Sequence, residues 1–487
     1  MQMGTHTDLH GHGASRLAVP LWLGLGAMLT VFAGLLAAYS HRFDWQLPVE
    51  QMPAATLGVA MALAGVVYLA TLPLIRRSLA LPAGTRQGLV AFVVAVGLGL
   101  RLILLFTEPA LEDDYNRYMW EGALTAHAVN PYAVSPIEAR RAPPDTALGQ
   151  LAREAGPVLA RVNHPDLRST YPPVAQAAFT LSYLIAPWNL TAWRLVVLAC
   201  DGASLILLLM LLRAAGRPAI WAALYWWNPI VIKELANSAH MDGLAVALVL
   251  GALLLSARRR HAAAVFVLGL AIGTKFWPAL LVPLCLRPLW PRFLPTAAGL
   301  ALLLLMTFAW AAPALLAGPD SHSGYVAYAH HWTTNSALFP MIEGLSRLLL
   351  RPWGFEAAAW ALARASIALF LGGFALYQAR RPIRSTEDLM ARAGAIVVAL
   401  VLLSPAQFPW YMIWMIPFLA FQPRWGLLVV TVTVPLYYLS FHYLARGNYE
   451  IFSTWIVWAV WAPVWALLGI DALKNAVLFR RRAASDA

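Results

Sequence analysis

Three consecutive acids in EDDYNRYMWEGALTAHAVNPY, residues 112–132, could do chemistry. Glu112, Asp113 and Asp114 follow an apolar segment, and Arg117 comes shortly after them. Adjacent acids raise one another's pKa values and a nearby arginine lowers them, so such a cluster can hold one carboxylate ionised and ready to accept a proton. Asp113 and Asp114 point in different directions on any regular backbone. At most one of them is therefore expected to be a base.

Other polar residues interrupt the apolar sequence further along the chain. Lys275 ends a short apolar segment, His240 and Asp242 share a turn with Glu234, and His331 lies in a third polar segment. Cations near an acid at a lipid boundary suit a reaction with a lipid phosphate as leaving group, because they stabilise the charge that grows as the bond breaks. Taken singly, each residue also fits a snorkelling lysine or an interfacial histidine. Together they favour a site.

The composition indicates a polytopic membrane protein. The 487-residue chain is 60% hydrophobic and 12% charged, far from the roughly 25% charged residues of an average soluble domain. Apolar runs such as LVAFVVAVGLGLRLILLF approach the roughly 20 residues that cross a bilayer and recur along the chain. The net charge of +12 lies in short clusters between these runs, as topology signals do, so it indicates orientation rather than nucleic-acid binding. The spacing of Cys200 and Cys285 suggests neither a disulfide nor a zinc site.

One transmembrane topology places all the basic clusters in the cytoplasm. It predicts an all-α protein with about 14 transmembrane helices (12–14) and both termini cytoplasmic. It requires residues 171–188 to lie on the outer surface, because a span there would move two basic clusters outside. The polar segments then emerge together on the outer side, at residues 107–190, 234–243, 273–277, 314–356, 404–410 and 442–450. The N-terminal segment GTHTDLHGHG could bind a metal, but a disordered tail is favoured, because histidines spaced around glycine hold no fixed geometry.

Several segments together resemble a known family. EDDYNRYMWEGALTAHAVNPYAVSP, followed by STYPPVAQ, WNPIVIKELANSAHMDG and GTKFWPALLVP, is similar to the GT-C glycosyltransferases. These are integral membrane enzymes that take a sugar from a polyprenyl phosphate. More narrowly, the chain resembles bacterial mannosyltransferase-like proteins of glycosyltransferase family 87, from roughly residue 90 to 420. The resemblance implies a GT-C fold, with the catalytic aspartate in the first outer loop of the core and juxtamembrane helices after it.

The resemblance also implies roles for individual residues. In the lipid A aminoarabinose transferases an acid lies three residues before an Arg-Tyr pair, and in the GPI mannosyltransferases a D-x-D-Y pattern occurs at this point. The acid before the Arg-Tyr pair and the second acid of D-x-D both correspond to Asp114, which is therefore the expected catalytic residue, and Asp113 is the second candidate. By the same resemblance Lys275 and His240 are expected near the donor phosphate. Further candidates for donor or substrate binding are Arg117, Glu234, Asp242 and Tyr171, and also His331 and Gln407, whose expected position on the outer face is the reason for including them. Glu112 replaces the first acid of the D-x-D pattern, which argues against a metal-binding pair. No cofactor or metal is therefore expected, although a divalent metal is possible.

The predicted arrangement of transmembrane helices and the resemblance together divide the chain into four parts. Residues 1–86 would be a cytoplasmic tail with two extra transmembrane helices, and 87–313 the GT-C core with the catalytic outer loop 107–190. Residues 314–356 would be a second outer loop and 357–487 the C-terminal transmembrane helices.

The implied activity is inverting transfer of a sugar, mannose by default, from a polyprenyl-phosphate donor to a glycolipid or glycan hydroxyl. It would take place at the outer face of the bacterial cytoplasmic (inner) membrane. Two alternatives stay open. A lipid-linked-sugar flippase or transporter would carry charges near the bilayer midplane. An O-antigen ligase or polymerase would carry an arginine-rich late outer loop, whereas 314–356 has only Arg347 and Arg351.

Overall fold

The computed structural model describes residues 17–485, so the prediction for the His-containing segment 4–13 lies outside the described residues. The described part is helical, and its sole pairing of extended segments is an isolated bridge between Thr334 and Ala406. The predicted all-α class is confirmed.

The chain forms two compact units. Unit 1 contains the described parts of Met1–Glu108 and Ile416–Ala487 together with Gly216–Lys233, and unit 2 contains Pro109–Ala215 and Glu234–Met415. All the candidate site residues predicted from the sequence belong to unit 2. The four parts predicted from the sequence follow the order of membrane spans and outer loops, whereas the two units are defined by their internal contacts. The four-part division therefore stays a prediction.

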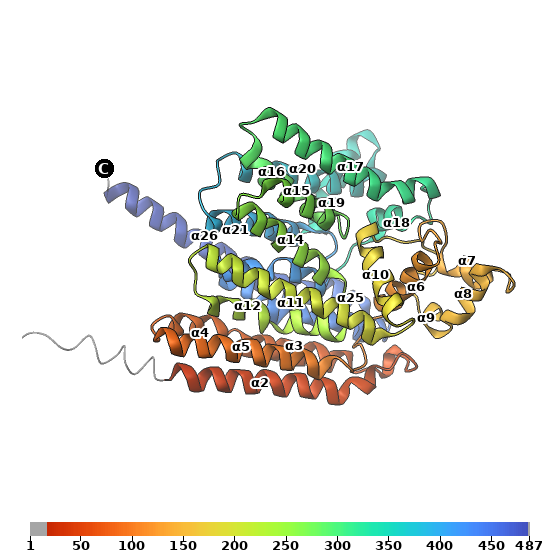
Figure 1. Ribbon diagram of the computed structural model, residues 1–487, viewed down its shortest axis with the longest axis horizontal. Helices are drawn as coiled ribbons and strands as arrows, with labels where there is room; N and C mark the ends of the chain where they lie inside the picture. Colours follow the sequence, from red (N-terminus) through yellow and green to blue (C-terminus); the bar gives the residue numbers. More distant parts are fainter. Residues whose placement is uncertain (1–16, 486–487) are drawn as a thin grey trace, which may run out of the picture. The chain divides into compact units, whose positions relative to one another are not determined.

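Unit 1 begins with four neighbouring helices, α2 (Ala18–Tyr39), α3 (Ala54–Tyr68), α4 (Thr71–Ser78) and α5 (Ala83–Leu104), and α2 packs against the other three (Figure 1). Its other elements are η1 (Ser40–Phe43), η2 (Val49–Gln51), η3 (Ala219–Ala222), α12 (Ala223–Trp226), α13 (Pro229–Ile232), η10 (Ile416–Ala420), α22 (Trp425–Leu428), α23 (Val430–Thr433), η11 (Val434–Tyr438), α24 (Leu439–Leu444), α25 (Tyr449–Ile451), η12 (Phe452–Ile456) and α26 (Val457–Ser485). Arg101, a costly residue in an apolar helix, donates hydrogen bonds of 2.9 Å to the carbonyls of Gly97 and Trp226 and lies over the Trp226 ring.

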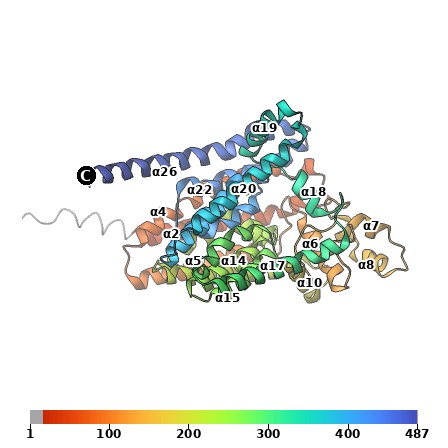
Figure 2. The same cartoon turned by 90° about the horizontal axis from the view of Figure 1, so that it is seen from above.

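Unit 2 contains a row of neighbouring apolar helices. α11 (Leu190–Ala214) packs on α14 (Asp242–Ala257), α14 on α15 (His261–Ile272), and α15 on α17 (Phe293–Ala317); α14, α15 and α17 lie close together in Figure 2. The other elements are α6 (Asp114–Ala126), α7 (Pro136–Arg141), α8 (Ala147–Ala155), α9 (Pro157–Ala160), α10 (Pro173–Ile185), η5 (Trp277–Leu281), α16 (Val282–Leu286), η6 (Arg287–Leu289), α18 (Gly324–His331), α19 (Leu338–Leu350), η7 (Arg351–Trp353), η8 (Glu356–Ala358), α20 (Ala359–Ala379), α21 (Thr386–Leu403) and η9 (Pro409–Trp414). The π-helical turn η4 (Lys233–Asn237) joins the two units in sequence.

Eight helices of the described chain are long and apolar enough to cross a bilayer, or nine if the bent pair Pro229–Asn237 and Asp242–Ala257 is one span. The eight are Ala18–Phe43, Ala54–Ser78, Ala83–Leu104, Leu190–Ala214, Phe293–Ala317, Glu356–Ala379, Trp425–Leu444 and Tyr449–Lys474. The chain is thus a multi-pass membrane protein. Other expected spans are short or broken: α15 has 12 residues, and residues 409–420 form the 3-10 helices η9 and η10. The count of about 14 stays a prediction.

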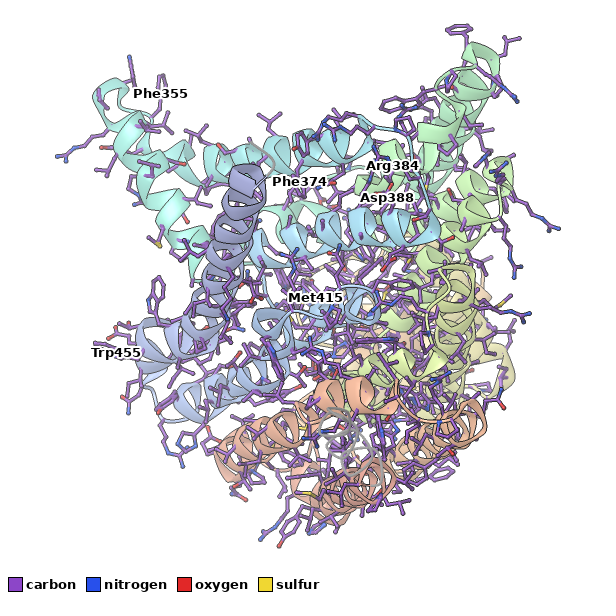
Figure 3. All side chains as sticks on the ribbon, turned by 90° about the vertical axis from the view of Figure 1, so that its left-hand side faces the viewer. Phe355, Phe374, Arg384, Asp388, Met415 and Trp455 are labelled. Carbon is purple, nitrogen blue, oxygen red and sulfur yellow. The ribbon has the colours of Figure 1, made fainter. Side chains whose placement is uncertain are left out.

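The helix that leads to η9 has a well-defined start. α21 begins after Ser385, whose hydroxyl accepts a hydrogen bond from the backbone N–H of Asp388. The Asp388 carboxylate in turn accepts one from the backbone N–H of Arg384, and Figure 3 shows the two residues side by side. This capping fixes the start of α21.

The segment predicted as the catalytic outer loop contains its own helices. α6 packs closely on α10 at Gly122, where an added Cβ would lie 2.4 Å from the Phe179 carbonyl oxygen. A small core of Trp120, Leu124, Leu151 and their neighbours joins α6 to α7, α8 and α9. α10 has 13 residues, too few to cross a bilayer alone. This agrees with keeping 171–188 out of the span count, while the outer-surface position stays a prediction.

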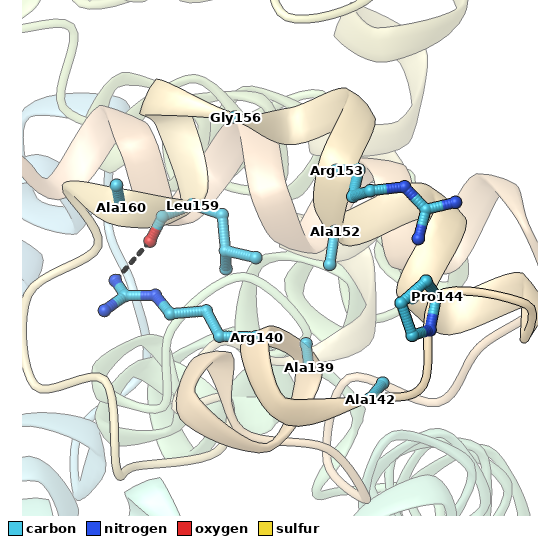
Figure 4. A pocket seen from close by; sticks show the side chains of 10 residues that line it. Ala139, Arg140, Ala142, Pro144, Ala152, Arg153, Gly156, Leu159 and Ala160 are labelled. Carbon is cyan, nitrogen blue, oxygen red and sulfur yellow. Dashed lines mark hydrogen bonds between the residues drawn. The ribbon is translucent and has the colours of Figure 1, made fainter.

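A cavity of ≈ 230 Å³ lies among α7, α8 and α9, and is lined by residues such as Ala139, Arg140, Arg153 and Gly156. Arg140 reaches across it to the carbonyl of Leu159 (Figure 4). None of the candidate site residues lines it.

Candidate active site

Asn237 joins the loop that carries the three acids to the turn that carries Glu234 and His240. Its side-chain Oδ1 accepts a 2.9 Å hydrogen bond from the backbone N–H of Ala110. Two α11 residues hold the turn: Arg194 donates to the Asn237 carbonyl, and the indole N–H of Trp193 donates to the Ala239 carbonyl at 2.7 Å. The first and second of the predicted polar segments are thus tied together by a hydrogen bond from the Ala110 backbone to the Asn237 side chain.

Asp114 is the first residue of α6 and keeps access to solvent, with 24% of its side chain exposed. Its Oδ1 accepts a 2.8 Å hydrogen bond from the Asn163 amide, and its Oδ2 lies 3.4 Å from the Tyr118 hydroxyl, which donates to it. Tyr118 is fixed by stacking on Phe179 and by edge contacts with Tyr171. The carboxylate is therefore held in one orientation and remains reachable.

Asp113 shares the same amide, because Asn163 Nδ2 also lies 2.8 Å from Asp113 Oδ1. Burial by the surrounding protein is the largest effect that raises the pKa of Asp113, and the negative charge of Asp114 raises it further. The hydrogen bond from Asn163 lowers this pKa and so opposes the rise. The side chain is nevertheless exposed to solvent, which screens these effects. A raised pKa leaves a larger share of Asp113 protonated near neutral pH, and a protonated carboxyl group cannot accept a proton from an acceptor hydroxyl.

Arg117 serves the loop that carries Asn163. It donates to the backbone carbonyls of Asn163, His164 and Leu167, and pairs with Glu121 at 3.4 Å. Arg117 is buried. The role that its contacts support is to hold the loop, and through Asn163 the two aspartates.

Glu121 is the buried carboxylate that pairs with Arg117. Its Oε2 accepts 2.6 Å hydrogen bonds from Ser169 Oγ and Gln176 Nε2. Burial raises the pKa of Glu121, and Arg117 and the two hydrogen bonds oppose the rise. The network connects α6 to the STYPPVAQ segment.

His240 lies between two carboxylates. Its Nε2 is 3.2 Å from Glu112 Oε2 and 3.5 Å from Glu234 Oε2, and its Nδ1 is 4.0 Å from Asp114 Oδ2. The ring stacks on Trp410, with centroids 4.1 Å apart. His240 is fully buried, and Glu112 and Glu234 are nearly so.

Lys275 lies beside aromatic rings on the other side of the turn. Its Nζ is 2.8 Å from Asp242 Oδ1, 4.6 Å from the Tyr411 ring centroid and 5.2 Å from that of Trp414. Trp414 also donates its indole N–H to Asp242 Oδ1. Lys275 retains 17% exposure, so the cation is held in place but can be reached.

Comparison with known proteins assigns the chain to a family. A family model described as alpha-(1->6)-mannopyranosyltransferase, N-terminal domain, matches residues 21–292, more than half of the sequence. The chain belongs to this family. The resemblance to bacterial mannosyltransferase-like proteins is thereby confirmed, and this family member is a glycosyltransferase.

Two relatives of this family member bear the name alpha-(1->6)-mannopyranosyltransferase A. The protein from Corynebacterium glutamicum is 22% identical over 386 residues, which are 72% of this chain and 75% of the relative. The protein from Mycobacterium tuberculosis is 25% identical over 433 residues, 81% of this chain and 78% of the relative. No solved structure matches.

The structure brings most of the predicted site residues of this family member together, and two lie elsewhere. Tyr171 contacts the Tyr118 ring next to Asp114. Gln407 is buried and donates to the carbonyls of Val401 and Leu402 at the end of α21, so its contacts are those of a helix cap. His331 is exposed at the end of α18, where its ring neighbours that of His330.

Several residues of the site were not among those predicted from the sequence. Asn163 reaches Asp114 from 49 residues further along the chain, and Gln176 reaches Glu121 from 55 residues further along. Glu121 lies four residues after Arg117 on the same helix. Trp410 and Trp414 lie in the SPAQFPW segment and just after it, and tryptophans are common at membrane interfaces. The one available signal was the polar break at 404–410 itself.

Proposed function

We propose that this family member transfers a mannosyl residue from a polyprenyl-phosphate-linked donor to a hydroxyl of a glycolipid or glycan. The names of both relatives support mannose as the sugar. Those names also give an alpha-(1->6) linkage, so we propose an α-mannosidic product. An inverting transfer forms an α bond only from a β-linked donor.

In the proposed reaction Asp114 is the general base. The acceptor oxygen gives its proton to the Asp114 carboxylate and bonds to the anomeric carbon, while the bond from that carbon to the phosphate oxygen breaks and polyprenyl phosphate leaves. The observation that carries this assignment is the Asp114 carboxylate itself, which is partly exposed and oriented by Asn163 and Tyr118. A positioned base contributes roughly 10²- to 10⁴-fold to such a step.

Lys275 is the cation proposed to meet the donor phosphate. Its ammonium group is fixed by Asp242 and flanked by the buried, mutually stacked rings of Tyr411 and Trp414. A fixed cation stabilises the charge that develops on the leaving phosphate. Arg117, by contrast, has its guanidinium engaged with backbone carbonyls and Glu121, so we assign it a positioning role.

The proposal includes a GT-C fold with about 14 crossings and a site on the outer face of the cytoplasmic membrane. Support comes from the multi-pass architecture, the short α10 and the position of Asp114 at the start of the first helix after α5. Polyprenyl-phosphate donors are lipids, so a site bordered by apolar helices suits them.

The test is transfer of radiolabelled sugar from synthetic polyprenyl-phosphate sugars to membrane lipid extract by the purified full chain. The panel contains β-mannosyl, α-mannosyl and β-glucosyl donors. We expect transfer from the β-mannosyl donor, a loss of about 10³-fold for Asp114→Asn and a smaller loss for Asp113→Asn. Asp145→Asn, an exposed acid of the same outer segment, is the control. Near wild-type turnover by Asp114→Asn would refute the base, and donor crossing proteoliposome membranes without transfer would refute the reaction class.

A further inference from the structure

We propose that Glu112, Glu234 and His240 form a binding site for one divalent transition-metal ion, of the Mn²⁺ or Zn²⁺ class. Each residue offers one ligand atom, and the three atoms lie within 4.8 Å of one another. The sequence alone argues against a metal at the Glu112–Asp114 pair. The structure supplies different partners for Glu112, from a turn more than a hundred residues later in the chain.

The spacing of the ligand atoms fits a shared ion. Metal bonds to imidazole nitrogen and carboxylate oxygen are about 2.0–2.2 Å long, so two ligands of one ion lie about 3–4 Å apart. The measured separations from His240 Nε2 are 3.2 Å to Glu112 Oε2 and 3.5 Å to Glu234 Oε2.

The His240 ring is the observation that distinguishes this cluster from a group of acids. It is fully buried, and neither ring nitrogen has a partner in hydrogen-bonding geometry among the described residues. Buried polar atoms normally have a hydrogen-bond partner. Nε2 faces both carboxylates at contact distance, which is the arrangement of a nitrogen that offers its lone pair to an ion held by all three groups.

The backbone around the ligands is held in unusual conformations. Leu111 and Ala239, the residues just before Glu112 and His240, have positive φ angles of 57° and 59°, which are uncommon for residues other than glycine. Glu234 lies in the π-helical turn η4, and the His240 N–H donates to the Glu234 carbonyl at 2.9 Å. Stacking on Trp410 fixes the imidazole plane. The three side chains are thus preorganised.

The ligand set selects the class of ion. An imidazole is a poor ligand for Ca²⁺ and Mg²⁺, which take oxygen ligands, whereas Mn²⁺ and Zn²⁺ accept imidazole together with carboxylates. The ion would lie one imidazole ring away from Asp114, whose Oδ2 is 4.0 Å from Nδ1 on the same ring. Metal-bound histidines commonly direct their second nitrogen at a carboxylate, so occupancy would help to orient the proposed base.

The experiment measures metal content without donor or acceptor, so its outcome is independent of the proposed reaction. The full chain is purified through an affinity tag without histidines, and its N-terminal His6, His10 and His12 are replaced by alanine to remove a competing site. After equilibration with Mn²⁺, Zn²⁺, Mg²⁺ or Ca²⁺, bound metal is counted by mass spectrometry and its affinity by calorimetry. We expect one Mn²⁺ or Zn²⁺ per chain, with Mg²⁺ and Ca²⁺ failing to displace it.

Ligand variants locate the ion. His240→Ala and Glu234→Gln should each weaken binding by at least about tenfold, whereas His330→Ala and Glu154→Gln, both exposed, should leave it unchanged. Unchanged binding in His240→Ala, or metal that disappears with the three N-terminal histidines alone, overturns the proposal. Should the ligand variants fail to fold, pulsed EPR of the Mn²⁺-loaded wild-type chain decides. Nitrogen coupling from a bound imidazole is expected, and its absence refutes the site.

Discussion

The side-chain amide of Asn163 donates a 2.8 Å hydrogen bond to Oδ1 of Asp114. The same nitrogen lies 2.8 Å from Oδ1 of Asp113, so one amide sets the relative orientation of two adjacent acids. Adjacent carboxylates repel each other, and a shared donor offsets part of that repulsion. Asn163 is therefore a positioning residue for the proposed base.

Removal of this amide should impair turnover more than binding. In Asn163→Ala, Asp114 loses its donor and its fixed orientation, and misplacement of a reacting group costs up to roughly 10²-fold in rate. We expect kcat to fall by about 10- to 100-fold, with KM for the donor little changed and an unaltered melting temperature. The control is Asp166→Ala, an exposed residue of the same loop. An equal loss in both variants would contradict the positioning role.

Arg117 should matter for stability as well as activity. Arg117→Met leaves the buried Glu121 without its cationic partner and releases three backbone carbonyls of the 163–167 loop. Removing one member of a buried pair destabilises by on the order of 3 kcal/mol. The apparent melting temperature in detergent should fall, and transfer should fall with it because Asn163 moves. Arg153→Met, on the exposed side of α8, should change neither quantity; an unshifted melting temperature for Arg117→Met would exclude the network.

The sequence identifies residues whose chemical type is unusual for their surroundings. Asp114, Lys275 and His240 are polar residues next to apolar runs, so their position alone suggests a site, and the structure places all three in unit 2. The role of Glu112 could not be predicted in this way. Its neighbours depend on the link between Ala110 and Asn237, 127 residues apart.

Asn163 is a site residue that the sequence did not predict, and Gln407 is a predicted site residue that has another role in the structure. Asn163 stands in an ordinary polar loop, and its contact with Asp114 depends on the folded position of that loop, whose carbonyl groups bind Arg117. Gln407 lies in a predicted outer turn, but its amide closes α21. The number of transmembrane helices is difficult to predict from the sequence for a related reason. Apolar composition is visible in sequence, whereas the breaks that shorten η9 and η10 depend on local proline geometry and packing.

Close packing of α6 against α10 predicts a steric effect at Gly122. A Cβ there would lie 2.4 Å from the Phe179 carbonyl oxygen, so Gly122→Ala forces the helices apart at a cost of about 1–3 kcal/mol. The matched control is Gly202→Ala in α11, where an added Cβ meets nothing within 4 Å and helix propensity should stabilise by up to roughly 1 kcal/mol. Opposite shifts in melting temperature are expected. A Gly122→Ala protein as stable as wild type would show that the two helices separate without cost.

Lys275 has two possible roles that a double-mutant experiment separates. It neutralises Asp242 at 2.8 Å, and we propose that it also meets the donor phosphate. Lys275→Met should lower kcat by about 10²-fold, as removal of one group that stabilises a developing anion does. If neutralising Asp242 were its whole function, adding Asp242→Asn would remove the unpaired charge and restore transfer. The proposed role predicts no recovery in the double variant, although its melting temperature should return towards that of the wild type. Steady-state rates and melting curves of the four proteins decide between the two, because recovered turnover in the double variant would reduce Lys275 to a structural ion pair.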